Sequence, residues 1–176
     1  MLTLDRESSA LLVIDFQGRL MPHIADGPAA VANARRLLDA AALLKVPVLF
    51  TEQNPAGLGP TVPELGPTGP TAHKMTFDAV REHGFLDALP AEKTLVVAGC
   101  EAHVCVLQTV LGLLAQGRRV FVVRDALGAR RAESKETALR RMERHGAETV
   151  TTEMVVFEWL ATCEHPRFRE AVALIK

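Results

Sequence analysis

Three short, uninterrupted apolar runs set the strongest limit on how this 176-residue chain can fold. They lie at residues 10–14 (ALLVI), 94–98 (TLVVA) and 119–123 (RVFVV). A strand with one wet face alternates apolar and polar residues, whereas a strand covered by helices on both faces reads as a continuous apolar run. These runs therefore predict buried parallel strands. Residues 46–50 predict a fourth strand, and residues 148–151 a weaker one.

Segments with helical spacing of apolar residues separate these runs. We expect helices at residues 28–45, 104–116, 134–145, 154–160 and 166–175. Strands that alternate with helices predict a three-layer α/β/α fold with a mostly parallel, Rossmann-like open sheet. The length and the 48% hydrophobic content suit one domain over residues 1–176 with one sizeable core.

One segment breaks the alternation. Residues 54–72 are dense in proline and glycine, so we predict no regular element there. A loop of this length inside a compact domain is usually functional or disordered.

Composition narrows the function class. The net charge is −1, from 20 basic and 21 acidic residues, which gives no support for a nucleic-acid partner. No stretch reaches the ~18 apolar residues of a membrane span, and the charged start of the chain does not resemble a signal peptide. With three cysteines, an odd number, we expect free thiols and a cytoplasmic location.

Polar residues follow the predicted strands at the point where each strand ends. Asp15 comes directly after the first run, the residues TEQN at 51–54 follow the next, and the segment 99–105 (GCEAHVC) follows the third. Ligands of open parallel sheets bind beyond the carboxyl ends of the strands. The sequence therefore predicts that a carboxylate, a polar cluster and a thiol meet at one edge.

Cys105 is the candidate nucleophile. It is predicted in the first turn of a helix, where unpaired N–H groups and the helix dipole favour a thiolate and can stabilise an oxyanion. Asp15 could act as general base, and Lys74 could stabilise the negative charge. Each residue also has a structural interpretation: a buried small hydrophobe, a loop anchor and a solvated charge, respectively. None of the three decides the matter alone.

The combination resembles the isochorismatase-like cysteine hydrolases, the superfamily that includes nicotinamidases and carbamoylsarcosine amidohydrolase. Four segments carry the likeness, in matching order and spacing: LLVIDFQ at 11–17, HKMTFDA at 73–79, VVAGCEAHVCVLQTVLGLLAQG at 96–117 and VFVVRDALGARR at 120–131. The third segment is the most specific. Within the superfamily, TEQNPAGLGPTVPEL at 51–65 is similar to the isochorismatase domain-containing proteins.

The resemblance implies a catalytic triad of Asp15, Lys74 and Cys105. It also implies a cis peptide bond between Cys100 and Glu101, which would direct backbone N–H groups, together with that of Cys105, toward a substrate oxygen. Family members are commonly dimers or tetramers, so we expect a homo-oligomer. The resemblance does not define the substrate.

Two departures from the family pattern refine the expectation. Nicotinamidases carry an Asp and two His as metal ligands after the second strand, whereas this chain has no histidine between Thr51 and His73. We therefore expect neither a metal nor any other cofactor. Isochorismatases lack the cysteine, so its presence favours acyl transfer through a thioester.

Five residues beside the predicted triad are candidate substrate contacts, with plain packing as the alternative: Phe16, Gln53, Leu58, Phe77 and His103. Glu101, His103 and Cys105 alternate as metal ligands sometimes do, but such a trio needs an extended backbone where a helix is predicted. We also expect Phe157 and Trp159 at a subunit contact.

The sequence thus predicts a cysteine hydrolase that acts on a small amide-like or related carbonyl substrate through an acyl-enzyme on Cys105. Two alternatives stay open. One is an isochorismatase-type hydrolase without covalent catalysis. The other is a catalytically idle protein with the same fold that serves in interaction or redox response.

Overall fold

A computed structural model describes residues 2–67 and 69–176. Within these residues, six strands form one sheet in the order β3-β2-β1-β4-β5-β6, and every neighbouring pair is parallel. The strands are β1 (Ser9–Ile14), β2 (Val48–Gln53), β3 (Thr71–Lys74), β4 (Thr94–Cys100), β5 (Val120–Gly128) and β6 (Glu148–Val150). The predicted α/β class with an open parallel sheet is confirmed.

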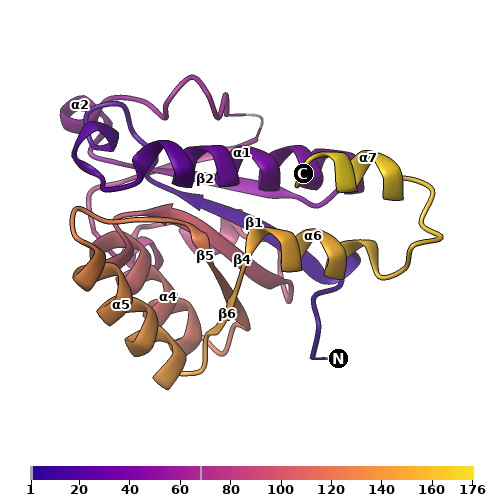
Figure 1. The fold of residues 1–176 in the computed structure, drawn as a ribbon. Helices are drawn as coiled ribbons and strands as arrows, with labels where there is room; N and C mark the ends of the chain where they lie inside the picture. The colour runs from indigo at the N-terminus through magenta and orange to yellow at the C-terminus, as the bar shows by residue number, and fades with distance from the viewer. Residues whose placement is uncertain (1, 68) are drawn as a thin grey trace.

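Helices cover both faces of the sheet, as Figure 1 shows. One face carries α1 (Gly27–Leu44), α6 (Thr152–Leu160) and α7 (Phe168–Ala173), and the other carries α4 (Leu107–Ala115) and α5 (Ala132–Arg144). Short elements connect them: η1 (Arg6–Ser8), η2 (Met21–His23), α2 (Pro55–Leu58), η3 (Ala79–Arg81), α3 (Phe85–Ala88) and a π-helical turn, η4 (Ala102–Val106). In the described part of the chain, no helix is long and apolar enough to cross a membrane.

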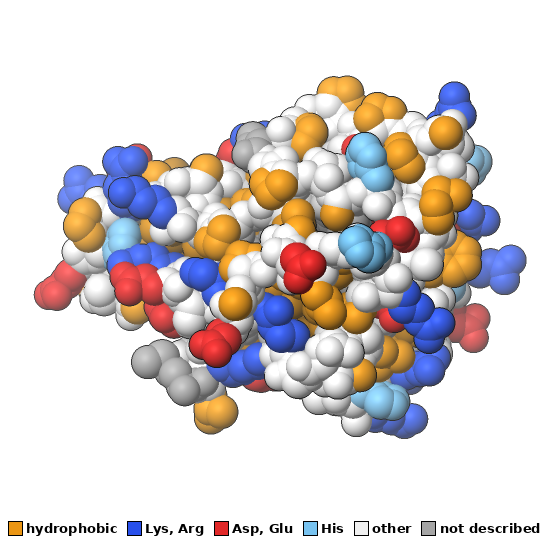
Figure 2. All heavy atoms as spheres, turned by 180° about the vertical axis from the view of Figure 1, so that it is seen from behind, with side chains coloured by type: hydrophobic (Ala, Val, Ile, Leu, Met, Phe, Trp, Pro, Cys, Tyr) orange, Lys and Arg blue, Asp and Glu red, His pale blue; other side chains and the backbone are white. Residues whose placement is uncertain are grey.

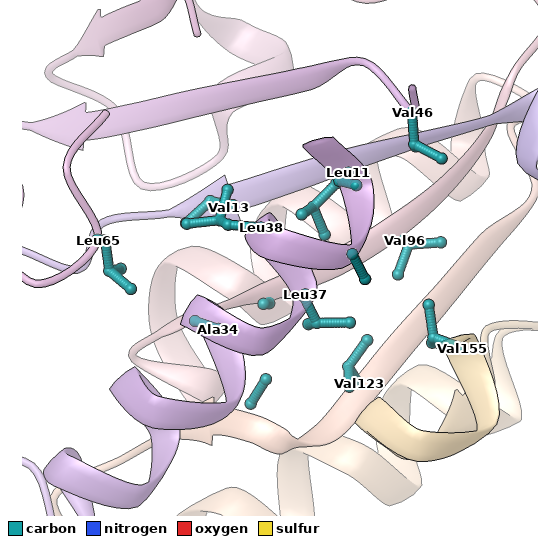
Figure 3. Close-up of a cluster of buried hydrophobic side chains, with 14 of the residues drawn as sticks. Leu11, Val13, Ala34, Leu37, Leu38, Val46, Leu65, Val96, Val123 and Val155 are labelled. Atoms are coloured by element: carbon teal, nitrogen blue, oxygen red, sulfur yellow. The ribbon is translucent and has the colours of Figure 1, made fainter. Parts of the chain in front are cut away.

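Strand β1 shows why its sequence is continuously apolar. Leu11 and Val13 belong to the core cluster under α1, which Figure 3 shows, whereas Leu12 and Ile14 belong to the cluster under α4 and α5. Successive side chains of a strand point to opposite faces. Because both faces are buried, every position in β1 is apolar or small.

The segment 54–72 holds more structure than the sequence predicts. Asn54 adopts a left-handed conformation with φ 40° and starts α2, whose first residue is Pro55. Thr71 begins strand β3, which pairs with β2 at the edge of the sheet. The prediction of no regular element is therefore wrong for these stretches; Thr68 lies outside the described residues. An edge strand of four residues, three of them not buried, leaves no apolar run to detect.

Two further predictions need correction. The helix expected from residue 104 is a π-helical turn up to Val106, and α4 begins at Leu107. Trp159 is 0% exposed within the chain, because it packs into the core cluster shared with α1, so it does not lie at a subunit contact. Phe157 is 41% exposed, and its predicted role at such a contact stays a prediction.

Candidate active site

Asp15 occupies the carboxyl end of β1 with no exposed surface. Its backbone has φ 51°, a left-handed conformation that Asp tolerates better than most residues. Its N–H donates to the Thr51 carbonyl at 3.1 Å. The Thr51 hydroxyl in turn donates to Asp15 Oδ1 at 2.7 Å. The end of β2 therefore fixes both the backbone and the carboxylate of Asp15.

Lys74, at the end of β3, is brought directly to this carboxylate. Its Nζ lies 2.7 Å from Asp15 Oδ2, and the lysine side chain is 1% exposed. Nζ also donates to the carbonyls of Thr76 at 3.3 Å and Phe77 at 3.5 Å. These three acceptors match the three donors of an ammonium group. A buried ion pair is tolerated only when such additional hydrogen bonds satisfy it.

Cys105 completes the cluster from the π-helical turn. Both Asp15 and Lys74 act electrostatically on its thiol. Burial raises the pKa of the thiol to about 12; the negative charge of Asp15 adds to this rise, and Lys74 opposes it. Desolvation is the largest cause of this rise, so the resting thiol is neutral and not the thiolate that the predicted helix start was expected to favour. Three side chains distant in sequence nevertheless meet at one edge of the sheet, as predicted.

The segment before Cys105 has the expected cis peptide bond between Cys100 and Glu101. Gly99 precedes it at a very close approach of two strands, where an added Cβ would lie 2.6 Å from the Ile14 carbonyl oxygen. The carboxylate of Glu101 lies 3.2 Å from Arg130 Nε and accepts from the Arg130 N–H at 3.3 Å. Glu101 is thus anchored to the loop after β5.

The structure brings two of the five predicted contact residues to the Lys74 loop. Gln53 donates from Nε2 to the Met75 carbonyl at 3.4 Å. Phe77 accepts from Lys74 through its carbonyl, and its side chain is 51% exposed.

The other three predicted contacts are placed differently. Phe16 is fully buried in the core cluster on the α1 side, opposite the cluster that contains Cys105, which makes it a packing residue. Leu58 ends α2, where its carbonyl accepts from the Arg19 N–H. His103 lies in the π-helical turn, and its Nδ1 is buried without a hydrogen-bond partner among the described residues.

Gln17 is a site-supporting residue that the sequence-based list of contacts missed. It is fully buried; its amide donates to the carbonyls of Gln53 at 3.1 Å and Gly59 at 2.6 Å, and its Oε1 accepts from the Gln53 N–H. It therefore ties the ends of β1 and β2 to the loop after α2. Its position two residues after Asp15, beyond an apolar strand, was the available signal.

An open cavity of about 320 Å³ adjoins Lys74 at the edge of the sheet. It is lined by Asn54, Pro55, Ala56, His73, Lys74, Met75 and Glu82. A larger cavity of about 780 Å³ lies between the start of α1 and residues 62–64, and no triad residue lines it. Position beside reactive groups, rather than size, makes the smaller cavity the candidate approach to the site.

A metal held by Glu101, His103 and Cys105 finds no support in the geometry. Within residues 2–67 and 69–176, no three His, Cys, Asp or Glu side chains are grouped closely enough to hold an ion. The backbone through Cys105 is helical, so alternate residues do not converge.

Comparison with known proteins places the chain in a family. The family model described as the isochorismatase domain matches residues 9–154. The chain belongs to the isochorismatase family. Isochorismatase domain-containing protein 2 of Pongo abelii is 42% identical over 174 residues, which cover 96% of this chain and 83% of that protein.

Solved structures agree with this family membership. MAR1 ribonuclease from Caenorhabditis elegans is 36% identical with a TM-score of 0.93, over 98% of this chain and 92% of that one. The YcaC gene product from Escherichia coli, described as an octameric hydrolase of unknown specificity, is 29% identical with a TM-score of 0.88, over 99% and 88%. YcaC from Pseudomonas aeruginosa, described with hexane-2,5-diol and covalent acrylamide, is 29% identical with a TM-score of 0.85, over 99% and 96%. The family and its solved relatives support the general class of hydrolase for this isochorismatase-family protein.

Proposed function

We propose that this protein is a cysteine hydrolase that cleaves a small amide-like or related carbonyl substrate through a covalent acyl-enzyme on Cys105. The observation that carries the proposal is the convergence of a carboxylate, an ammonium group and a thiol, all buried, at the carboxyl ends of parallel strands. This edge is where open α/β sheets bind ligands.

The first half of the reaction forms the acyl-enzyme. Asp15 takes the proton from Cys105 Sγ, and the thiolate attacks the carbonyl carbon to form a C–S bond. The negative charge moves to the carbonyl oxygen, which accepts hydrogen bonds from the N–H groups of Cys105 and of the residues after the cis bond. The C–N bond then breaks, and the amine leaves with the proton that Asp15 returns.

The second half releases the acid. Asp15 takes a proton from water, and the resulting hydroxide attacks the thioester carbonyl. The C–S bond breaks, and Asp15 returns its proton to the sulfur. One water is consumed, and the enzyme returns to its starting protonation state.

The electrostatics of the site support a role for Lys74. Because burial and Asp15 hold the thiol protonated at neutral pH, the nucleophile forms only when its proton can move to Asp15. Lys74 lowers the cost of that step, since its charge favours the thiolate. The ammonium group also stays beside Asp15 when the carboxyl group becomes protonated, which keeps the pair aligned for the return transfer.

Acrylamide is a suitable first probe. A similar solved structure contains it covalently; a thiolate adds to its C=C bond, so an adduct of the whole acrylamide mass on Cys105 tests the nucleophile, whereas the amide panel tests acyl transfer. The proposal predicts ammonia release from members of a small-amide panel, and an acyl mass on the peptide that contains Cys105. Cys105→Ala should reduce turnover to background, whereas Cys163→Ala, which removes the exposed thiol, should not. Full turnover by Cys105→Ala would refute the proposal and would favour hydrolysis without covalent catalysis.

The name ribonuclease on three similar solved structures defines a competing activity. The charge balance of this chain argues against an RNA substrate, because RNA binding depends on clustered positive charge. Incubation with single-stranded RNA should leave the RNA intact under conditions where the amide panel is turned over. RNA cleavage that Cys105→Ala abolishes would instead favour the competing activity. No turnover of any substrate, combined with peroxide oxidation of Cys105, would favour the idle, redox-responsive alternative.

A further inference from the structure

A buried threonine on the helix that follows Cys105 contacts the loop that follows Lys74. Thr109 lies in α4, one helical turn after Cys105, and is 0% exposed. Its hydroxyl accepts from the Ala79 N–H at 3.0 Å and donates to the Phe77 carbonyl at 3.4 Å. The Phe77 carbonyl is also an acceptor for Lys74 Nζ, at 3.5 Å. One carbonyl oxygen thus connects the nucleophile helix to the lysine.

The same loop is held from its solvent side. The Glu82 carboxylate accepts from the Met75 N–H at 3.0 Å, and from the Thr76 N–H and hydroxyl at 3.5 and 3.3 Å. The Thr76 carbonyl is another acceptor for Lys74 Nζ. Both backbone acceptors of the lysine therefore sit in a loop that is anchored at two points.

Helix α4 packs against this loop with little free space. A Cβ added at Gly112, three residues after Thr109, would lie 2.7 Å from Asp78 Oδ1. Because the helix and the loop are in direct contact, a hydrogen bond between them can fix their relative position rather than bridge a gap.

We propose that Thr109 is a positioning residue: through the Phe77 carbonyl it fixes Lys74 Nζ relative to Cys105. The chemical value of this position rests on the proposed function, since Lys74 matters to catalysis only if Cys105 is the nucleophile. Without the hydroxyl, the Phe77 carbonyl loses a donor and the Ala79 N–H loses its acceptor. The loop loosens, and the ammonium group is held less firmly beside the sulfur.

The test measures alkylation of Cys105 by iodoacetamide from pH 6 to 11, quantified by mass spectrometry of the peptide that contains it. This readout needs no substrate, so it can fail independently of amide turnover. Thr109→Val keeps the shape of the side chain and removes the hydroxyl. We expect its alkylation rate at a given pH to fall ~3- to 10-fold. This fall corresponds to a shift of the pH–rate curve to higher pH by ~0.5–1 pH unit. Thr109→Ser, which restores the hydroxyl, should return the curve to that of the wild type.

Thr152→Val is the matched control. Thr152 is also a buried threonine, at the start of α6, and its hydroxyl donates to Asp125 Oδ1 of β5 at 3.0 Å. Thr152→Val should lower the melting temperature without moving the alkylation curve.

A second variant, Glu82→Ala, loosens the loop after Lys74 from the surface. It should move the alkylation curve in the same direction as Thr109→Val, and it replaces Thr109→Val in the test if that variant does not fold. Unchanged or faster alkylation of Cys105 in the folded variants would overturn the proposal.

Discussion

At the scale of single residues, the site depends on how one carboxylate is buried. Asp15 has no exposed surface, and each of its oxygens accepts a hydrogen bond, from Thr51 and from Lys74. An unpaired charge at such a position is strongly unfavourable. The pairing lets Asp15 stay inside the protein next to a neutral thiol, which is the arrangement that proton transfer from Cys105 requires.

Replacing the carboxylate separates catalysis from thiol reactivity. The charge of Asp15 raises the pKa of the Cys105 thiol, and Lys74 lowers it. Asp15→Asn removes the first effect and keeps the second, so the pH–rate curve for alkylation should shift to lower pH. Turnover should fall ~100-fold or more, because no general base remains. Both are measured on the same preparation, after circular dichroism has shown that the variant is folded. Turnover within about threefold of the wild type would exclude Asp15 as the base.

At the scale of elements, the segment that carries Cys105 depends on close contact between two central strands. Gly99, the residue before the Cys100–Glu101 bond, pairs with Ile14 of β1. A side chain there would meet the Ile14 carbonyl oxygen at 2.6 Å and Ile14 Cβ at 2.7 Å. Because these contacts include backbone atoms of a central strand, neither strand can move aside without breaking sheet hydrogen bonds.

We therefore expect Gly99→Ala to destabilise the protein. The free energy of unfolding should fall by about 1–3 kcal/mol, the range typical of overpacking in a well-packed interior. Urea denaturation followed by circular dichroism measures it. Gly18→Ala is the control, because its new Cβ would have only an ordinary contact, at 3.8 Å from the Pro60 carbonyl oxygen. Equal stability of the two variants would show that the β1–β4 contact adapts freely.

At the scale of the whole molecule, the surface is better suited to contact between copies of the chain than to binding of a charged polymer. On the face in Figure 2, basic and acidic side chains are interspersed and hydrophobic side chains lie among them. On α6, Met154 and Phe157 are 44% and 41% exposed. They are three residues apart, so they lie on the same side of the helix. A similar solved protein is described as octameric.

We expect this chain to form a homo-oligomer in which Phe157 contributes to a contact. Light scattering after size-exclusion chromatography should give a mass that is a multiple of the 19.1 kDa chain. Phe157→Glu should shift that mass toward one chain, because a charge buried at an interface without a partner is unfavourable. Leu86→Glu places the same charge on α3, at a residue that is 37% exposed, and should leave the mass unchanged. A single-chain mass for the wild type would contradict the prediction.

The sequence determined the fold class and the convergence of Asp15 and the segment up to Cys105 at the carboxyl ends of the strands. Continuous apolar runs record burial on both faces of a strand, which is a local property of each run. The polar residue after such a run then lies at a strand end in any parallel sheet. The sequence alone therefore assigns Asp15 and the segment up to Cys105 to the same end of the strands.

Only the tertiary structure decided the properties that depend on neighbours distant in the chain. Strand β3 forms because it can hydrogen-bond to the edge of β2. Strand β3 in turn places Lys74 beside Asp15. Desolvation by the surrounding elements, with the charge of Asp15, raises the pKa of the Cys105 thiol and keeps it neutral. Phe16 enters the core while Phe77 stays exposed, although both follow polar or charged residues closely in sequence. Periodicity describes the faces of one element, whereas burial and electrostatic environment are sums over all the elements packed around a residue.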